Sequence, residues 1–84
     1  MDKEALAAIK ADIVLDTRGL SCPMPILRVK KELKTMKKGQ IVEVWSTDPG
    51  SKKDMPDFAK KQGEEFLGYL DETGYTRYII KKGG

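Results

Sequence analysis

Residues 16–25 read DTRGLSCPMP and hold the only cysteine of the chain, followed directly by the first of two prolines. Proline suits the first turn of a helix, and it pushes the residue before it toward an extended conformation. The pattern therefore predicts a helix N-terminus at this point. Because Pro25 also disfavours helical backbone angles at Met24, either Cys22 or Met24 is the expected N-cap. Both choices place the cysteine sulfur near the positive end of a helix dipole.

This placement makes Cys22 the candidate catalytic residue. A surface helix terminus stabilises a nearby anion by about 0.3 to 1 kcal/mol, whereas one pKa unit corresponds to about 1.4 kcal/mol. The dipole alone therefore lowers the pKa of a thiol only modestly, and Arg18 is the candidate cation for further stabilising the thiolate. Pro23 and Pro25 are the candidates for positioning the helix start. The alternative is that Cys22 is a small buried hydrophobic residue and the prolines simply begin a helix.

The segments next to this stretch contain one predicted strand and one predicted helix. Residues 1–11 form good helical sequence but have little to bury, so we expect a frayed lead-in before a single domain over residues 12–82. The short apolar run at residues 13–15 predicts a central strand. From Pro25 to Lys38 apolar residues recur every three or four positions, which predicts a helix of about 14 residues ended by Gly39.

The predicted helix has one apolar and one basic face. The expected buried residues are Ile26, Leu27, Val29, Leu33 and Met36. On the other face, Arg28, Lys31 and Lys34 form a candidate docking surface for acidic partner proteins, because they recur at helical spacing beside the cysteine end. The alternative is a charged face that is only solvated surface.

The remaining sequence predicts three more strands and a second helix. Residues 40–47 predict a second strand, joined to the first by a right-handed parallel crossover. Ser51 and Asp54 form a capping-box-like start, but Pro56 predicts a tight turn over 51–54 and a regular helix only from about Met55 to Gln62. That helix should bury Met55, Phe58 and Ala59. Residues 64–71 and 75–82 predict two strands joined as a hairpin.

The predicted element order is β-α-β-α-β-β. Two short helices cannot cover both faces of a sheet, so the expected fold is an α/β (α+β) two-layer sandwich with both helices on one face of a four-stranded mixed sheet.

Composition excludes several kinds of site. The chain has no histidine, which excludes a Ser-His-Asp triad, a Cys-His hydrolase and a histidine-ligated metal. A single cysteine forms neither an internal disulfide nor a thiolate zinc cage, so we expect no metal and no cofactor. The net charge is +3, but the aromatic residues fall in predicted strands and not in the basic helix, so we expect no direct nucleic-acid contact. Without a signal-peptide pattern or a long apolar run, we expect a cytoplasmic protein with no membrane contact.

The chain resembles the TusA/SirA-like family of small sulfur-carrier proteins, whose mark is a Cys-Pro-x-Pro motif opening the first helix. Here the motif is Cys22-Pro23-Met24-Pro25. The resemblance covers residues 12–82 and includes the preceding residues 16–20, Lys30-Lys31, the turn at 48–50 with residues 54–58, and Gly63. Many relatives have a histidine where this chain has Glu64, a departure that bears on partner choice.

The resemblance implies a sulfur carrier, a sulfurtransferase-type protein that is a transferase if it is classed as an enzyme. Cys22 would accept sulfane sulfur as a persulfide from a cysteine desulfurase or a rhodanese-like donor. It would pass the sulfur to the thiol of a DsrE-like protein or of a tRNA-thiolation component. The pathway would be tRNA thiolation or cofactor biosynthesis, or dissimilatory sulfur metabolism. We expect a monomer. The alternative from another class is a non-catalytic regulatory or interaction module in which Cys22 is structural.

Overall fold

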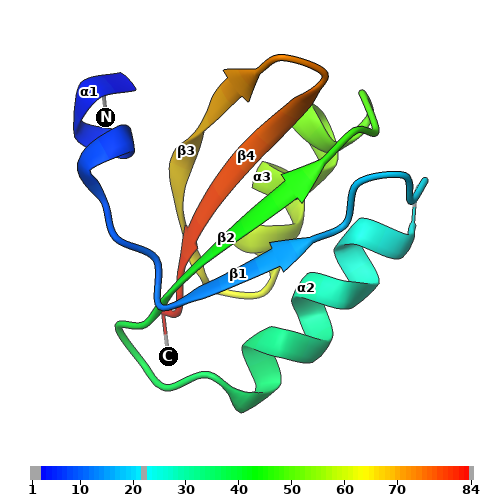
Figure 1. Ribbon diagram of the computed structural model, residues 1–84. Helices are drawn as coiled ribbons and strands as arrows, with labels where there is room; N and C mark the ends of the chain where they lie inside the picture. Colours follow the sequence, from blue (N-terminus) through cyan, green and yellow to red (C-terminus); the bar gives the residue numbers. More distant parts are fainter. Residues whose placement is uncertain (1–2, 22, 84) are drawn as a thin grey trace.

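A four-stranded sheet lies at the centre of the molecule (Figure 1). The computed structural model describes residues 3–21 and 23–83. In chain order, the elements are α1 (Lys3–Ala8), β1 (Ile13–Asp16), α2 (Met24–Thr35), β2 (Ile41–Ser46), α3 (Ser51–Lys61), β3 (Glu65–Glu72) and β4 (Tyr75–Lys81). The strand order is β1-β2-β4-β3, with β1 and β2 parallel and the other neighbours antiparallel. This mixed sheet confirms the predicted fold class. The expectation of a central first strand is wrong, because β4 pairs with the other side of β2 and leaves β1 at the edge.

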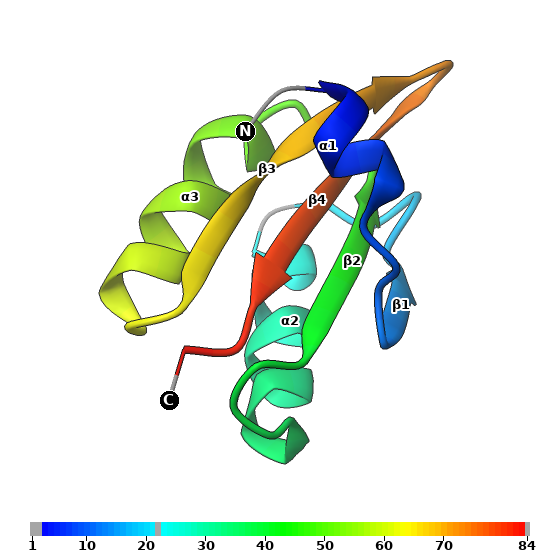
Figure 2. The same ribbon diagram turned by 90° about the vertical axis from the view of Figure 1, so that its left-hand side faces the viewer.

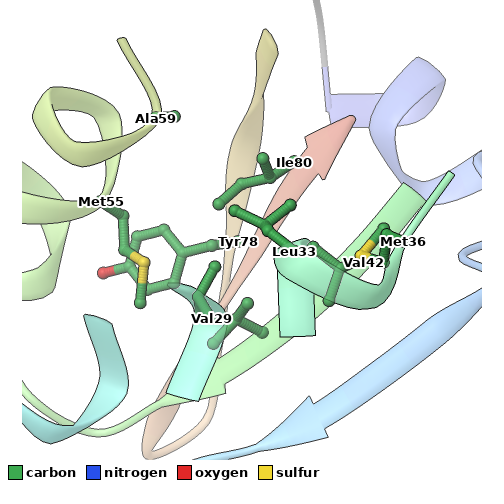
Figure 3. Close-up of a cluster of buried hydrophobic side chains, with 9 residues drawn as sticks. Val29, Leu33, Met36, Val42, Met55, Ala59, Tyr78 and Ile80 are labelled. Atoms are coloured by element: carbon green, nitrogen blue, oxygen red, sulfur yellow. The ribbon is translucent and has the colours of Figure 1, made fainter. Parts of the chain in front are cut away.

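The main core lies between the sheet and the helices α2 and α3 (Figure 3). Strand residues alternate between the two faces of a sheet, so every second residue of β2 and β4 points toward these helices. The buried cluster consists of Val29, Leu33, Met36, Val42, Val44, Met55, Ala59, Tyr78 and Ile80. The prediction of buried residues is confirmed for the five members of this cluster that come from the two predicted helices, which are Val29, Leu33, Met36, Met55 and Ala59. Ile26 and Phe58 are only partly buried, and the prediction is wrong for Leu27, which is 49% exposed.

Helix α2 begins one residue before the predicted Pro25 and ends three residues before the predicted Lys38. Its N-cap is Pro23, not Cys22 or Met24, and Met24 is already helical. The helix ends at Thr35 and not near Lys38, because Met36 adopts an extended backbone conformation while its side chain remains in the core.

Helix α3 is continuous across Pro56, so the predicted division at Met55 is wrong. A proline near the start of a helix removes one intrahelical hydrogen bond, and its fixed φ is compatible with helical geometry. The predicted capping box is also absent, since the N-cap is Gly50 and no side chain caps the helix. Ser51 is instead buried, with its Oγ 3.2 Å from Oγ of Ser46. This contact joins the start of α3 to the end of β2.

Helix α1 covers part of the opposite sheet face, as Figures 1 and 2 show. Leu6 is only 3% exposed and packs in a second cluster with Leu70 and Ile79. The expectation that the lead-in has little to bury is therefore wrong. Alternation along β4 puts Ile79 on the face away from α2 and α3, where an apolar side chain gains by being covered. The domain boundary at residue 12 stays a prediction.

Glu64 lies at the end of the sheet where β4 finishes, away from the start of α2. Its carboxylate accepts hydrogen bonds from Lys82 Nζ and from the Gly83 backbone N–H, both at 3.1 Å. Glu64 is buried, and its two hydrogen bonds hold the segment after β4 against the start of β3. Its influence on partner choice stays a prediction.

Candidate functional site

The candidate site centres on the loop from β1 to α2, at the end of the sheet where the parallel strands β1 and β2 finish (Figure 1). Cys22 itself lies outside the described residues, so its exposure and its thiolate character stay predictions. Its chain neighbours Ser21 and Pro23 are both exposed. Helix α2 begins directly afterwards, with the Met24 N–H donating to Ser21 O at 2.9 Å and the Leu27 N–H to Pro23 O at 3.0 Å. Pro25, in contrast, is buried in the first turn.

The first half of the loop is bonded to the end of β2. The N–H and the Oγ1 hydroxyl of Thr17 both donate to the Trp45 carbonyl, at 2.8 and 2.6 Å. The Gly19 N–H donates to Thr47 Oγ1 at 2.9 Å. Thr17 is only 2% exposed. These bonds hold the loop backbone against the strand that follows α2.

Arg18 lies on the sheet face opposite α2 and α3. Its Nε and Nη2 donate to the two carboxylate oxygens of Asp16, at 2.9 and 2.8 Å. Its Cζ lies 4.9 Å from the ring centre of Trp45 and 5.2 Å from that of Tyr75. Because Val44 points into the core under the helices, the next residue, Trp45, points to the other face. The predicted role of Arg18 as a stabiliser of the Cys22 thiolate stays a prediction.

The pair formed by Asp16 and Arg18 holds both side chains in their charged forms. The side-chain hydrogen bond from Arg18, with the backbone N–H of the same residue, lowers the pKa of Asp16. The same side-chain hydrogen bond raises the pKa of Arg18. Arg18 therefore has a carboxylate partner already in place on the sheet.

A row of polar side chains continues from Trp45 across the same sheet face. Trp45 Nε1 donates to Glu43 Oε2 at 2.6 Å, and Glu43 Oε1 accepts from Arg77 Nη2 at 2.7 Å. Arg77 Nη1 then reaches Glu72 Oε1 at 3.3 Å. Burial raises the pKa of Glu43, but the hydrogen bonds from Arg77 and Trp45 and the charge of Arg77 outweigh it and lower that pKa.

This row was missed by the sequence analysis. One signal was available, since Glu43 is the only charged residue in the apolar run of β2 and a buried carboxylate needs partners. Its partners Arg77 and Glu72 come from the hairpin of β3 and β4, and strand order was needed to identify them.

A shallow groove of about 530 Å³ runs beside α2 and brings two of the three predicted docking residues together. Its lining consists of Leu15, Met24, Leu27, Arg28, Lys31 and Glu32. Met24 and Leu27 are 41% and 49% exposed, and the sequence analysis did not identify them as surface residues. Lys34 is exposed on the same helix but does not line the groove.

A second hollow of about 320 Å³ lies between α2 and α3. Pro23, Ile26 and Phe58 form its apolar lining, and Asp54, Asp57 and Lys61 form the rest. Pro23 thus connects this hollow to the loop that carries Cys22.

Among residues 3–21 and 23–83, no group of three or more histidine, cysteine, aspartate or glutamate side chains is arranged to hold a metal ion. Within those same residues, no helix has the length and apolar character needed to cross a membrane.

Comparison with known proteins places this chain in a family. Residues 13–82 match the family model described as sulfurtransferase TusA. The sulfur carrier protein TusA of Allochromatium vinosum is 49% identical over 71 residues, which cover 84% of this chain and 93% of that protein. The putative sulfur carrier protein YrkF of Bacillus subtilis is 46% identical over 76 residues, which cover 90% of this chain but only 41% of YrkF.

A solved structure agrees with these sequence relatives. The SirA-like protein from Desulfitobacterium hafniense superposes with a TM-score of 0.74 at 28% identity, covering 86% of this chain and 99% of that one. The predicted resemblance to TusA/SirA-like proteins is confirmed, and the chain belongs to the TusA family of sulfur-carrier proteins.

Proposed function

We propose that this chain carries sulfane sulfur as a persulfide on Cys22 and relays it from a donor protein to an acceptor protein. The observation that supports this most strongly is the position of the only cysteine in a TusA-family chain, between two exposed residues and directly before α2. A carrier thiol must meet the cysteine of another protein, so it has to be presented at the surface.

The proposed chemistry is two successive thiol exchange steps. The Cys22 thiolate attacks the outer sulfur of the donor persulfide, the donor's sulfur–sulfur bond breaks, and the donor thiolate leaves. Cys22 then carries one additional sulfur. In the second step an acceptor thiolate attacks that outer sulfur, and the Cys22 thiolate leaves. Neither step needs a protein side chain as an acid or base, so a chain without histidine is competent for it.

The two prolines position the helix start in this proposal. Pro23 is the N-cap of α2, and Pro25 is buried in the first turn. Neither residue has a backbone N–H to donate to an earlier carbonyl, so the helix does not extend backward over Cys22. The sulfur then remains at the positive end of the helix.

Donor and acceptor proteins dock, in this proposal, against the groove beside α2. Its exposed Met24 and Leu27 supply apolar contact, and Arg28 and Lys31 at its rim attract acidic surfaces. Lys34 adds to the positive field on the same helix. The chemistry requires a persulfide donor, such as a cysteine desulfurase or a rhodanese-like protein, and a thiol acceptor. The acceptor is a DsrE-like protein in dissimilatory sulfur metabolism, or a component of tRNA thiolation or cofactor biosynthesis.

Intact mass spectrometry tests the carrier function. After incubation with a cysteine desulfurase and cysteine, or with a rhodanese-like donor and thiosulfate, the chain should gain the mass of one sulfur atom. A reductant should remove it, and a Cys22→Ser variant should not gain it. Loaded chain mixed with a DsrE-like protein or with a tRNA-thiolation component should lose its sulfur to the true acceptor. If no donor loads Cys22 while the serine variant keeps partner binding, the chain is an interaction module with a structural cysteine.

A further inference from the structure

We propose that Arg18 is a positioning residue that holds the loop carrying Cys22 from the far side of the sheet. It acts with Asp16, Trp45 and Tyr75, and these four residues are called the arginine clamp below. The inference rests on the proposed role of Cys22. It assigns Arg18 a mechanical role in place of direct stabilisation of the thiolate.

The guanidinium of Arg18 contacts a carboxylate along its edge and two aromatic rings at its face. The carboxylate of Asp16 binds the edge through two hydrogen bonds, at 2.9 and 2.8 Å. The rings of Trp45 and Tyr75, whose centres are 5.5 Å apart, lie against the cation at 4.9 and 5.2 Å. A planar guanidinium can bind a carboxylate through two parallel N–H groups while its face lies against a ring, whereas the ammonium group of lysine has neither the two-pronged edge nor the flat face.

The clamp acts on the backbone that leads to Cys22. Asp16 Oδ1 also accepts the backbone N–H of Arg18 at 3.1 Å, so one carboxylate fixes both the main chain and the side chain of the same residue. On either side of Arg18, the loop is bonded through Thr17 to Trp45 on β2 and through Gly19 to Thr47, the residue after β2. Only Leu20 and Ser21 then separate this fixed segment from Cys22.

The aromatic side of the clamp is itself fixed. Trp45 Nε1 is bonded to Glu43, whose carboxylate binds Arg77 on β4, which reaches Glu72 on β3. With Asp16 on β1 and Trp45 on β2, this row of interactions spans all four strands in the order β1-β2-β4-β3. The loop position is thereby tied to the sheet as a whole.

The charge of Arg18 is already engaged with other groups. Its carboxylate partner is Asp16, and its contacts with Trp45 and Tyr75 keep it on the face of the sheet opposite α2. A charge already paired at 2.8 Å presents little net field to a second anion. The geometry therefore favours a role in position over a role in thiol acidity.

Arg18→Gln and Arg18→Lys test the proposal, with Lys60→Gln as the control for loss of one exposed positive charge on α3. The first measurement is the emission of Trp45, the only tryptophan, together with hydrogen exchange of the amides at residues 17–21. The glutamine and lysine variants should both change the emission and speed exchange in the loop, by about tenfold, while the control changes neither.

The second measurement separates position from charge. The rate of sulfur acceptance should fall about threefold to tenfold in both Arg18 variants, because a misplaced reacting group slows transfer. The pH midpoint of Cys22 alkylation should remain where it is in the unmodified chain. If the lysine variant restores acceptance, or if the midpoint rises in the glutamine variant while the loop exchanges as before, Arg18 acts through its charge and the clamp is refuted. Failure of the unmodified chain to accept sulfur would overturn the carrier function, whereas emission and exchange would still report on the clamp.

Discussion

Replacing Leu6 with alanine should destabilise the whole domain, although Leu6 lies in a helix of only six residues near the N-terminus. Its side chain is 3% exposed and packs on Leu70 and Ile79. Leucine-to-alanine changes in protein cores cost about 2 to 5 kcal/mol of unfolding free energy. Because α1 touches the sheet on one side only and can settle into the space left, we expect the lower end, about 2 kcal/mol.

Replacing Gly68 tests the same contact from the side of the sheet. It has φ +148°, and a Cβ added there would lie 2.7 Å from Leu6 Cδ1 and 3.1 Å from Cδ2. Gly68→Ala should therefore cost backbone strain and also push Leu6 away, about 2 to 3 kcal/mol in total. Gly74→Ala is the matched control, since Gly74 also has a positive φ, +84°, but nothing within 4 Å of the added carbon. It should show backbone strain alone.

A double-mutant cycle isolates the contact between the two residues. In a chain that already has Leu6→Ala, the steric part of the Gly68→Ala effect should disappear, leaving a coupling free energy of about 1 kcal/mol. Urea unfolding followed by Trp45 emission gives the four free energies. The reasoning is wrong if Leu6→Ala changes stability by less than about 0.5 kcal/mol, or if Gly68→Ala has the same effect in both backgrounds.

Three further outcomes are expected. Burial raises the pKa of Tyr78 to about 12, and its hydroxyl has no hydrogen-bond partner among the described residues. As pH rises, Tyr78 therefore ionises first in the unfolded chain, and the free energy of unfolding falls by about 1.4 kcal/mol per pH unit above pH 10. Urea unfolding at pH 8 to 11 should show that Tyr78→Phe is at least as stable as the unmodified chain and that its free energy of unfolding falls less over this range. In the folded chain the pKa of Glu43 is below its usual 4.5, so ionised Glu43 stabilises the fold above pH 4.5, and this stabilisation is lost as pH falls through the folded pKa. Acid unfolding of Glu43→Gln should lack this part of the pH dependence. Reversing the charge of Arg28 and Lys31 should slow association with an acidic donor about tenfold and flatten its salt dependence in stopped-flow measurements, whereas Lys60→Glu should keep the unmodified rate.

Local patterns in the sequence determined the elements and the family. The apolar spacing from Pro25 to Lys38 predicted that Val29, Leu33 and Met36 are buried, because helical periodicity records which side of a helix faces the core. The Cys-Pro-x-Pro motif and its neighbours sufficed to identify the family, and the predicted element order with only two short helices led to the fold class. These inferences depend on residues close together in the chain.

The sequence could not determine which distant residues meet. The buried position of Leu6 depends on Leu70 and Ile79, and the orientation of Arg18 depends on Trp45 and Tyr75, all of them far along the chain. The periodicity of apolar residues indicates that a side chain is buried, but it does not indicate which element buries it, because the same apolar pattern is compatible with several strand orders. Only the order β1-β2-β4-β3 brings these residues together on the second face of the sheet. The tertiary structure therefore decided that this face contributes a docked helix and an arginine clamp behind the loop that carries Cys22.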